Sequence, residues 1–291
     1  MSKFILTAFA DEICDDLNEQ MDVLARHGIK FIEFRGADGK GVAGYTPEEA
    51  LAARLRMKAR GFAVSAVGSP VGKTFIDDDF EPAFAQFKQV VALAKAFGTQ
   101  YIRLFSYYIP EGDDPSAWRA EVMKRMQAMA DYAGQAGVIL LHENEKGIYG
   151  DTPERCHDLF DTVQSPALWA TYDPSNFVQC GVQNYPHAFR MLKDKIRYVH
   201  MKDSVDTAGE AQADTGFDTH VVSDAHRPVG QGDGNCREIL AELWHDGYEG
   251  FLSIEPHLVN NHDIPGTGAE KFAVAADALN KLIAEIQAEE A

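Results

Sequence analysis

Short strand-like runs and helical segments alternate along this chain, and this alternation restricts the possible folds more than any other feature. Eight runs are rich in β-branched and aromatic residues, as buried strands are; they lie at residues 4–9, 30–34, 62–67, 101–105, 138–142, 169–172, 197–201 and 251–254. Segments with the apolar spacing of helices lie between and after them, at residues 17–27, 46–60, 80–97, 118–135, 186–196, 235–244 and 268–289. Strand-then-helix units in this order predict a parallel (β/α)8 barrel.

Signals for helix boundaries support this alternation. Thr46 is followed by Pro47 and Glu49, which predicts an N-cap with a capping box, and Thr152 repeats part of that signal. Glycine follows several of the predicted helices, where a left-handed C-cap suits it, at Gly28, Gly61, Gly98, Gly137 and Gly247. No linker rich in Pro, Gly or Ser interrupts the series, and barrels of this kind commonly occupy about 250 residues. We therefore expect residues 1–291 to form a single domain.

Charge, cysteine content and hydropathy argue against several classes of protein. The 27 basic and 45 acidic residues give a formal net charge of -18, which disfavours binding to a phosphate backbone. The four cysteines form no C-x-x-C pair, so they indicate neither a disulfide framework nor a thiolate zinc site. No run approaches the roughly 18 apolar residues of a membrane span, and the N-terminal apolar run is short for a signal peptide. We expect a cytoplasmic protein without nucleic-acid or membrane partners; whether it is a homo-oligomer stays open.

Four successive strand-like runs in the second half each end in a residue type that binds metal ions. These residues are Glu143, Asp173, His200 and Glu255. In a (β/α)8 barrel the carboxyl ends of the strands surround one opening, so these side chains would converge there. Any one of them alone would more commonly cap a helix or face solvent. Three carboxylates and one imidazole together favour one divalent cation, with Mn²⁺, Mg²⁺ or Co²⁺ preferred and Zn²⁺ also compatible.

The motifs around these residues resemble a known family. They are Leu141-His142-Glu143-Asn144, Tyr172-Asp173-Pro174-Ser175-Asn176, Val199-His200-Met201-Lys202-Asp203, Pro228-Val229-Gly230-Gln231-Gly232-Asp233-Gly234 and Gly247-Tyr248-Glu249-Gly250-Phe251-Leu252-Ser253-Ile254-Glu255-Pro256-His257. Together they resemble the xylose-isomerase-like TIM-barrel superfamily over essentially the whole barrel. Within it the sequence is similar to the sugar phosphate isomerase/epimerase group, which includes ketose 3-epimerases, hydroxypyruvate isomerases and inosose dehydratases. The motifs are specific for the superfamily and do not specify a substrate.

The resemblance implies a role for each of the four residues. Glu143, Asp173, His200 and Glu255 would hold the metal. In the epimerases, the glutamates at the positions of Glu143 and Glu255 also face opposite sides of a keto sugar and exchange the proton on the carbon beside its carbonyl. General chemistry supports these roles, because a cation at the sugar oxygens stabilises an enediolate while one carboxylate removes the proton and the other returns it.

Further residues are candidates for contacts with the substrate. Lys202 lies two residues beyond His200 and therefore shares its face of the strand, although a salt bridge with a neighbouring carboxylate explains it equally well. His257 stands in the same relation to Glu255 and could instead cap the following loop. Arg227 resembles in placement an arginine that binds sugar oxygens in the epimerases.

Two positions depart from the pattern of the ketose 3-epimerases. Those enzymes usually carry a second glutamate and a histidine where this chain has Tyr149 and Asn176. Asn176 can form a hydrogen bond with a hydroxyl group but cannot act as an acid at neutral pH. The nearby Glu145 and Lys146 could contact a different substrate or could form an exposed ion pair. These departures argue against a free ketohexose bound in the usual epimerase pose.

Other polar residues could line the same opening. In the N-terminal half they are Asp11, Glu12, Glu33, Arg35, Lys73, Arg103, Tyr107 and Tyr108. Glu33 could equally be a structural carboxylate paired with Arg35 or Arg103. Residues 203–235 form a long glycine-rich stretch after the seventh strand, which predicts a lid or a substrate wall on this face.

Three functions remain after these observations. The first, which we favour, is a metal-dependent isomerase or epimerase that acts on a keto sugar or related polyol through an enediolate. The second is a lyase or dehydratase on a keto sugar, keto-glycoside or inosose, in which Lys202 or His257 would protonate the leaving group. The third is an abasic-site endonuclease, which shares this barrel; the net charge of -18 and the single four-ligand set argue against it.

Overall fold

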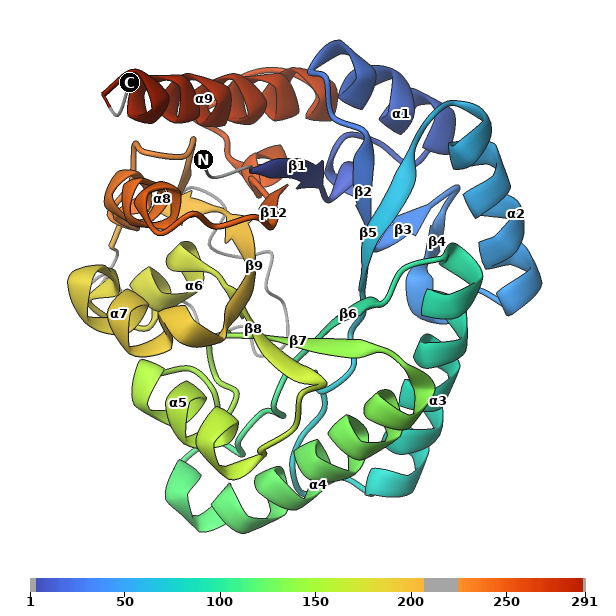
Figure 1. Cartoon of the computed structure of the whole chain (residues 1–291), viewed down its shortest axis with the longest axis vertical. Helices are drawn as coiled ribbons and strands as arrows, with labels where there is room; N and C mark the ends of the chain where they lie inside the picture. Colours follow the sequence, from blue (N-terminus) through green and yellow to red (C-terminus); the bar gives the residue numbers. More distant parts are fainter. Residues whose placement is uncertain (1–3, 207–224, 290–291) are drawn as a thin grey trace.

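A barrel of eight parallel strands forms the centre of the molecule (Figure 1). The computed structural model of the chain describes residues 4–206 and 225–289. The strands pair in parallel in the order β1-β12-β9-β8-β7-β6-β5-β2, and β1 lies beside β2, which nearly closes the ring. Their bounds are β1 (Ile5–Ala8), β2 (Phe31–Phe34), β5 (Ala63–Gly68), β6 (Tyr101–Leu104), β7 (Ile139–Glu143), β8 (Leu168–Tyr172), β9 (Ile196–Met201) and β12 (Phe251–Ile254). The predicted (β/α)8 barrel is confirmed.

Helices surround the barrel on its outside (Figure 1). The α-helices are α1 (Leu17–Arg26), α2 (Pro47–Ala59), α3 (Phe80–Phe97), α4 (Pro115–Ala136), α5 (Pro153–Thr162), α6 (Pro174–Gln179), α7 (Phe189–Leu192), α8 (Cys236–His245) and α9 (Gly268–Glu289). Shorter helical turns are η1 (Ala10–Glu12), η2 (Val42–Gly44), η3 (Asn184–Ala188), η4 (Lys193–Lys195) and η6 (Leu258–Asn260). Within the described ranges, no helix is both long and apolar enough to cross a lipid bilayer.

The predicted helix over residues 186–196 is helical but not one regular helix, because η3, α7 and η4 follow one another along it. Leu192, with φ -104° and ψ -11°, departs from regular α-helical angles where α7 gives way to η4, and Tyr185, with the extended angles φ -119° and ψ 136°, precedes the predicted range. The predicted capping box of α2 is present: Thr46 Oγ1 accepts from the Glu49 amide at 3.2 Å, and Glu49 Oε2 accepts from the Thr46 amide at 2.7 Å. Gly98 ends α3 in the left-handed conformation with φ 80°.

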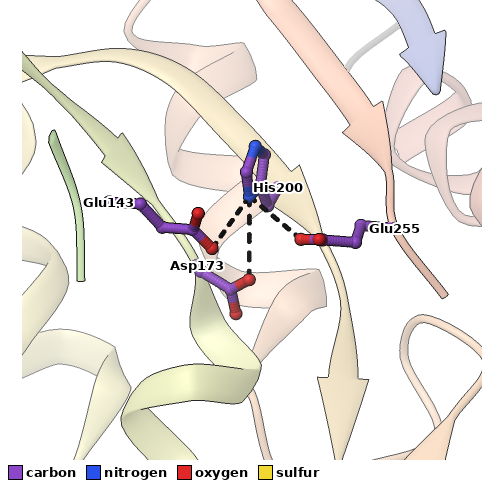
Figure 2. Close-up of side chains that lie close together, drawn as sticks. All are labelled: Glu143, Asp173, His200 and Glu255. Atoms are coloured by element: carbon purple, nitrogen blue, oxygen red, sulfur yellow. Dashed lines mark hydrogen bonds and ion pairs between the residues drawn. The ribbon is translucent and has the colours of Figure 1, made fainter. Parts of the chain in front are cut away.

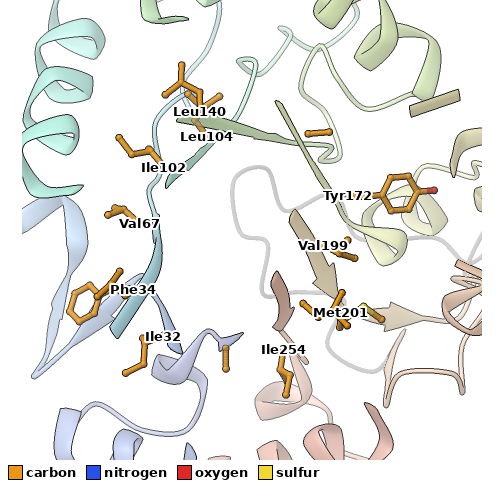
Figure 3. Packing of buried hydrophobic residues seen from close by; sticks show 14 of the residues in the cluster. Ile32, Phe34, Val67, Ile102, Leu104, Leu140, Tyr172, Val199, Met201 and Ile254 are labelled. Atoms are coloured by element: carbon orange, nitrogen blue, oxygen red, sulfur yellow. The ribbon is translucent and has the colours of Figure 1, made fainter. Parts of the chain in front are cut away.

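The larger apolar core lies between the strands and the helices. Alternate residues of the barrel strands are buried there (Figure 3), among them Ile32, Phe34, Leu104, Val199 and Ile254. Because successive side chains of a strand point to opposite faces, the intervening residues face the interior of the barrel.

The interior of the barrel is apolar at one level and polar at the next. Leu141 and Tyr198 belong to a small apolar cluster, and Glu143 and His200 follow them by two residues on the same strands. Strand alternation therefore delivers polar side chains to the carboxyl end of the barrel, above an apolar floor.

The two ends of the long stretch after β9 are held together by a short antiparallel strand pair. β10 (Asp203–Ser204) pairs antiparallel with β11 (His226–Arg227), and this pair brings together the two sides of the predicted lid. The part of that prediction that falls on residues 207–224 lies outside the described residues. A second short pair, β3 (Gly36–Ala37) with β4 (Lys40–Gly41), follows β2.

Candidate metal centre

Four side chains from four neighbouring strands converge at the carboxyl end of the barrel (Figure 2). Glu143 ends β7, Asp173 directly follows β8, His200 lies in β9, and Glu255 directly follows β12. One potential ligand atom from each lies within 4.8 Å of all the others. His200 Nδ1 is 3.1 Å from Glu143 Oε1, 3.0 Å from Glu255 Oε2 and 3.9 Å from Asp173 Oδ2. The predicted ligands are thus brought together, and we refer to these four residues as the quartet.

The chemistry of the quartet fits a divalent cation. All four residues are at most 3% exposed. Among the described residues, Glu143 Oε2, Asp173 Oδ2 and Glu255 Oε2 are buried and accept no hydrogen bond. Basic groups lie within ion-pair distance of these oxygens, and buried carboxylate oxygens are strongly unfavourable unless such a charge or a cation compensates them. Three such oxygens beside an imidazole nitrogen form a donor set that Mn²⁺, Mg²⁺, Co²⁺ or Zn²⁺ can use.

Burial and neighbouring charges set the pKa values in the quartet. Burial works against ionisation of Glu143, but the positive charges of His200 and Arg103 outweigh it and lower the pKa of Glu143 to about 2. Burial also works against protonation of His200, yet the surrounding glutamates Glu143, Glu33 and Glu255 raise its pKa well above the usual value. Burial raises the pKa of Asp173 to about 7, although Lys202 opposes this. In the absence of a cation, a proton on His200 therefore helps to balance the negative charge of the carboxylates.

Basic side chains contact the carboxylates of the quartet. Lys202 Nζ is 2.9 Å from Asp173 Oδ2 and 3.6 Å from Glu255 Oε2. Arg103 Nε is 3.3 Å from Glu143 Oε2, and Arg35 Nη1 is 3.2 Å from Glu255 Oε1. The salt bridge considered as an alternative for Lys202 exists, with Asp173 as the partner, and it also places the ammonium group at the site.

His257 lies at the edge of the quartet in an unusual backbone conformation. Its φ of 48° is in the left-handed region, which is uncommon for residues other than glycine. Its amide donates to Glu12 Oε2 at 2.7 Å, and its Nε2 is 3.4 Å from Glu255 Oε1. The imidazole is therefore held beside one of the two candidate acid–base glutamates, and its contact with a substrate stays a prediction.

Other residues predicted to contact the substrate have protein partners. Asn176 Nδ2 donates to Glu143 Oε1 at 3.1 Å, so this side chain orients a candidate ligand. Glu145 is paired with Lys73 across 2.8 Å, while Lys146 is exposed. Arg227 lies on β11 and donates to the carbonyl of His226 at 2.9 Å. Whether these residues contact a substrate stays a prediction.

Some residues of the opening play parts that the sequence did not predict. Glu33 is paired with His200, since both of its oxygens lie 3.2 Å from His200 Nε2. The two arginines considered for it have other partners, because Arg35 contacts Glu255 and Arg103 contacts Glu143. Asn144 joins β7 to the segment after β8, since its side chain donates to the carbonyl of Asp173 at 2.8 Å and accepts from its amide at 2.9 Å. Tyr107 lies away from the quartet against α4, where its hydroxyl is 3.8 Å from Met129 Sδ. The sequence feature that could have identified Glu33 as a functional residue is its charge inside the otherwise apolar strand β2.

Three comparisons with known proteins bear on this site. The family model described as xylose isomerase-like TIM barrel matches residues 21–284. The fructoselysine 3-epimerase of Shigella flexneri is 24% identical over 214 residues, which are 71% of this chain and 71% of that protein. Among solved structures, the probable 3-DHS dehydratase AsbF from Bacillus anthracis has a TM-score of 0.74 at 18% identity and covers 96% of this chain and 98% of its own. The IolI protein with a bound zinc atom also has a TM-score of 0.74, at 15% identity, and covers 97% and 99%. At these identities the structural likenesses show the fold alone.

Proposed function

Because this chain belongs to the xylose isomerase-like TIM barrel family, we propose that it is a divalent-metal-dependent isomerase or epimerase of a keto sugar or related polyol, acting through an enediolate. The observation that carries the proposal is the buried quartet, whose three carboxylates and one imidazole come from four neighbouring strands. The similarity to a fructoselysine 3-epimerase supports a sugar substrate. The predicted family membership is confirmed, whereas the reaction is our proposal.

The quartet would hold the cation, and a bound cation would supply Lewis-acid stabilisation of negative charge on the oxygens of the substrate. The chain itself would supply the groups that move the proton. Glu143 and Glu255 approach His200 from different strands and lie on different sides of it in Figure 2. A carboxylate on one face of the sugar can remove the proton beside the carbonyl, and one on the other face can return it with inversion.

Neighbouring side chains keep both glutamates ionised and oriented. The pKa of Glu143 is about 2, with its carboxylate between Arg103 and Asn176. Burial opposes ionisation of Glu255, but Lys202 and His200 lower its pKa well below the usual value. Both groups are therefore bases at neutral pH, and Arg35 holds the outer oxygen of Glu255 at 3.2 Å. These contacts leave each carboxylate few alternative orientations, which favours proton transfer along a fixed path.

A lyase is the second candidate, and the position of His257 favours it. Elimination requires an acid that protonates the departing oxygen, and the imidazole of His257 lies 3.4 Å from Glu255 Oε1. Lys202 is less suited to that role. Burial lowers its pKa, but Asp173 and Glu255 more than reverse this and leave the pKa raised, so the ammonium group retains its proton. Lys202 is better suited to binding substrate oxygens as a cation.

Deuterium exchange tests the proposal and separates the two candidates. Metal-loaded protein would be incubated in D₂O with a panel of ketoses, keto-glycosides and inososes, and the products followed by NMR. We expect deuterium on the carbon beside the carbonyl without loss of water or aglycone. Elimination products would instead support the lyase, and a panel with neither outcome at any metal loading would contradict both.

Variants of the two glutamates test the proton-transfer pair. We expect Glu143→Gln and Glu255→Gln to reduce exchange by at least about 100-fold, as removal of a general base commonly does. The metal content of each variant must be measured alongside, because both residues are also proposed ligands. Glu249→Gln is the matched control, since this exposed glutamate precedes β12 at the opposite end of the barrel and should leave exchange unchanged. Full activity of either site variant would contradict the assignment.

A further inference from the structure

Glu33 is a fully buried carboxylate on the side of His200 that faces away from the rest of the quartet. Its exposure is 0%, and both of its oxygens lie 3.2 Å from His200 Nε2. The other ring nitrogen, Nδ1, faces Glu143, Asp173 and Glu255. The imidazole therefore separates Glu33 from the three carboxylates that would hold the cation.

Neither a lysine nor an arginine pairs with Glu33 in the described part of the chain, where His200 is its only ion-pair partner. Arg35 lies two residues further along the same face, but its guanidinium contacts Asp11 at 2.6 Å and Glu12 at 3.3 Å, besides Glu255. Arg103 contacts Glu143. A carboxylate without exposure is strongly unfavourable for stability unless a partner compensates it, and for Glu33 that partner is the imidazole of His200. Glu33 therefore serves as a polar partner for the Nε2 atom of His200 and is more than a side chain that fills space in the core.

The backbone aims Glu33 at this position. The pairing of β2 with β5 shifts register between Ile32 and Glu33, so that Ile32 pairs with Val64 but Glu33 pairs with Ala66. Such a bulge changes the direction of the side chains beside it. The extra residue, Ser65, joins Thr7 at 2.7 Å and the hydroxyl of Tyr198 at 2.9 Å in the same buried layer.

The ring of His200 has little freedom to turn. Phe9 packs against it edge-on with ring centroids 5.2 Å apart, and Tyr198 does so at 5.9 Å. In this fixed plane, a hydrogen on Nε2 can be donated to Glu33 while Nδ1 presents its lone pair to the cation site. A carboxylate behind a metal-binding histidine fixes the ring and makes the other nitrogen a better ligand.

We propose that Glu33 is a positioning residue that holds His200 with Nε2–H donated to it and Nδ1 aimed at the cation. The inference rests on the proposed metal dependence but not on the identity of the sugar. Loss of such a partner commonly weakens metal binding by about 10- to 100-fold. We expect a loss of this size in Glu33→Gln, which keeps the shape of the side chain and removes its charge.

Zinc binding without any sugar tests the inference. Zn²⁺ affinity would be measured by calorimetry for the wild type, Glu33→Gln and Ser65→Ala. The last variant removes a buried polar group from the same layer that does not contact His200, and its affinity should stay within about threefold of wild type, below the loss typical of residues that contact a ligand. In the zinc-loaded wild type, ¹⁵N NMR of labelled histidine should show zinc at Nδ1 and hydrogen at Nε2 of His200, with His200→Asn used to assign the signals.

The outcomes separate this inference from the proposed function. Equal zinc affinities in Glu33→Gln and Ser65→Ala would overturn the role of Glu33, as would zinc at Nε2 of the wild type. The second result needs no variant, so it decides the question even if Glu33→Gln does not fold. Wild-type protein that binds zinc as expected but exchanges no deuterium with any sugar would overturn the proposed function and leave the role of Glu33 supported. A wild type that binds no divalent metal would overturn both.

Discussion

The carboxylates around His200 that would hold a cation also favour protonation of its imidazole. Burial disfavours the charged imidazole, but Glu143, Glu33 and Glu255 raise its pKa well above the usual value. Without metal, these carboxylates therefore favour the protonated form of His200. A cation that uses Nδ1 must displace a proton, because both cannot share the same lone pair.

This competition makes metal binding dependent on pH. The affinity for Mn²⁺ should rise as pH increases from 6 to 8, since fewer protons then compete for His200 and for Asp173, whose pKa is about 7. Binding should release at least about one proton per metal ion, which calorimetry in buffers of different ionisation enthalpy measures. An affinity that does not change with pH would contradict this account of the quartet.

His142, the neighbour of Glu143, provides a separate prediction about stability. Burial lowers its pKa from 6.5 to about 4, and its ring packs against Phe160 and contacts Ser106 at 2.9 Å. Its contribution to stability is complete above pH 6.5. As pH falls towards 4, the unfolded chain binds a proton that the folded chain does not, and up to about 3 kcal/mol is lost.

The measurement is the free energy of unfolding as a function of pH in the wild type and two variants. His142→Gln should flatten the loss of stability between pH 6.5 and 4, because the buried titrating group is gone. His157→Gln, on the exposed side of α5, should leave the slope unchanged. Equal slopes in both variants would show that His142 is not the source.

At the residue scale, the sequence predicted the four members of the quartet, but not the ion pairs and hydrogen bonds that its neighbours make with them. The quartet follows from strand ends, because each ligand stands at or near the end of a recognisable strand. The pairing of Glu33 with His200 could not be predicted, since β2 and β9 are not neighbours in the sheet. The contact also depends on the bulge between β2 and β5, in which Ser65 is the extra residue. Asn176 was read as a substrate contact because the sequence does not reveal its bond to Glu143.

At the scale of elements, Asp203 anchors the segment that follows β9. Its buried carboxylate accepts four backbone hydrogen bonds, from the amides of Ser204 at 3.0 Å, Gly230 at 2.9 Å, Gly232 at 3.0 Å and Gly234 at 2.9 Å. Glycine is required by the close approach: a Cβ on Gly232 would lie 2.5 Å from Asp203 Oδ1 and 2.6 Å from the carbonyl of Ser204. Three glycines of the stretch predicted to form a lid or a substrate wall thus fold around one carboxylate.

A substitution at Gly232 tests this arrangement. Gly232→Ala should destabilise the protein by about 1–3 kcal/mol, as overpacking a tight contact does. Gly134→Ala in helix α4 is the control, because the new methyl group would lie 3.7 Å from Ala167 Cβ, an ordinary contact distance, and should stabilise the protein by about 0.5–1 kcal/mol. Thermal unfolding measures both, and a neutral Gly232→Ala would contradict the close packing.

Among the helices, the long ones were predicted from the sequence and the short α6 was not. The periodicity of α3 and α9 extends over many turns, so their positions follow from the pattern alone. Helix α6 spans only Pro174–Gln179 and was not predicted, although Asp173 caps it and Pro174 occupies its first turn. One short turn contains too few apolar positions to establish a period, and only its capping signal could have identified it.

At the scale of the whole molecule, the site exists only in the folded barrel. Its four ligands come from β7, β8, β9 and β12, which three successive parallel pairings hold side by side. A cation that binds only the folded state stabilises it through mass action. Metal loading and global stability should therefore change together.

The coupling can be measured as the rise in unfolding free energy on addition of metal. At a concentration about 100 times its dissociation constant, Mn²⁺ should add about 2.7 kcal/mol, and EDTA should reverse the effect. Asp173→Asn should abolish the metal-dependent gain while preserving the cap of α6, because asparagine is an equally good N-cap residue. A gain of the same size in Asp173→Asn would place the stabilising metal elsewhere.

The proposed function depends on one divalent cation held by Glu143, Asp173, His200 and Glu255. The most direct test is an anomalous difference map from crystals grown with Mn²⁺ and measured at a wavelength where manganese scatters anomalously. We expect one strong peak bonded to an oxygen of each of the three carboxylates and to His200 Nδ1. A strong peak elsewhere, with none among these four side chains in crystals that contain Mn²⁺, would contradict the account.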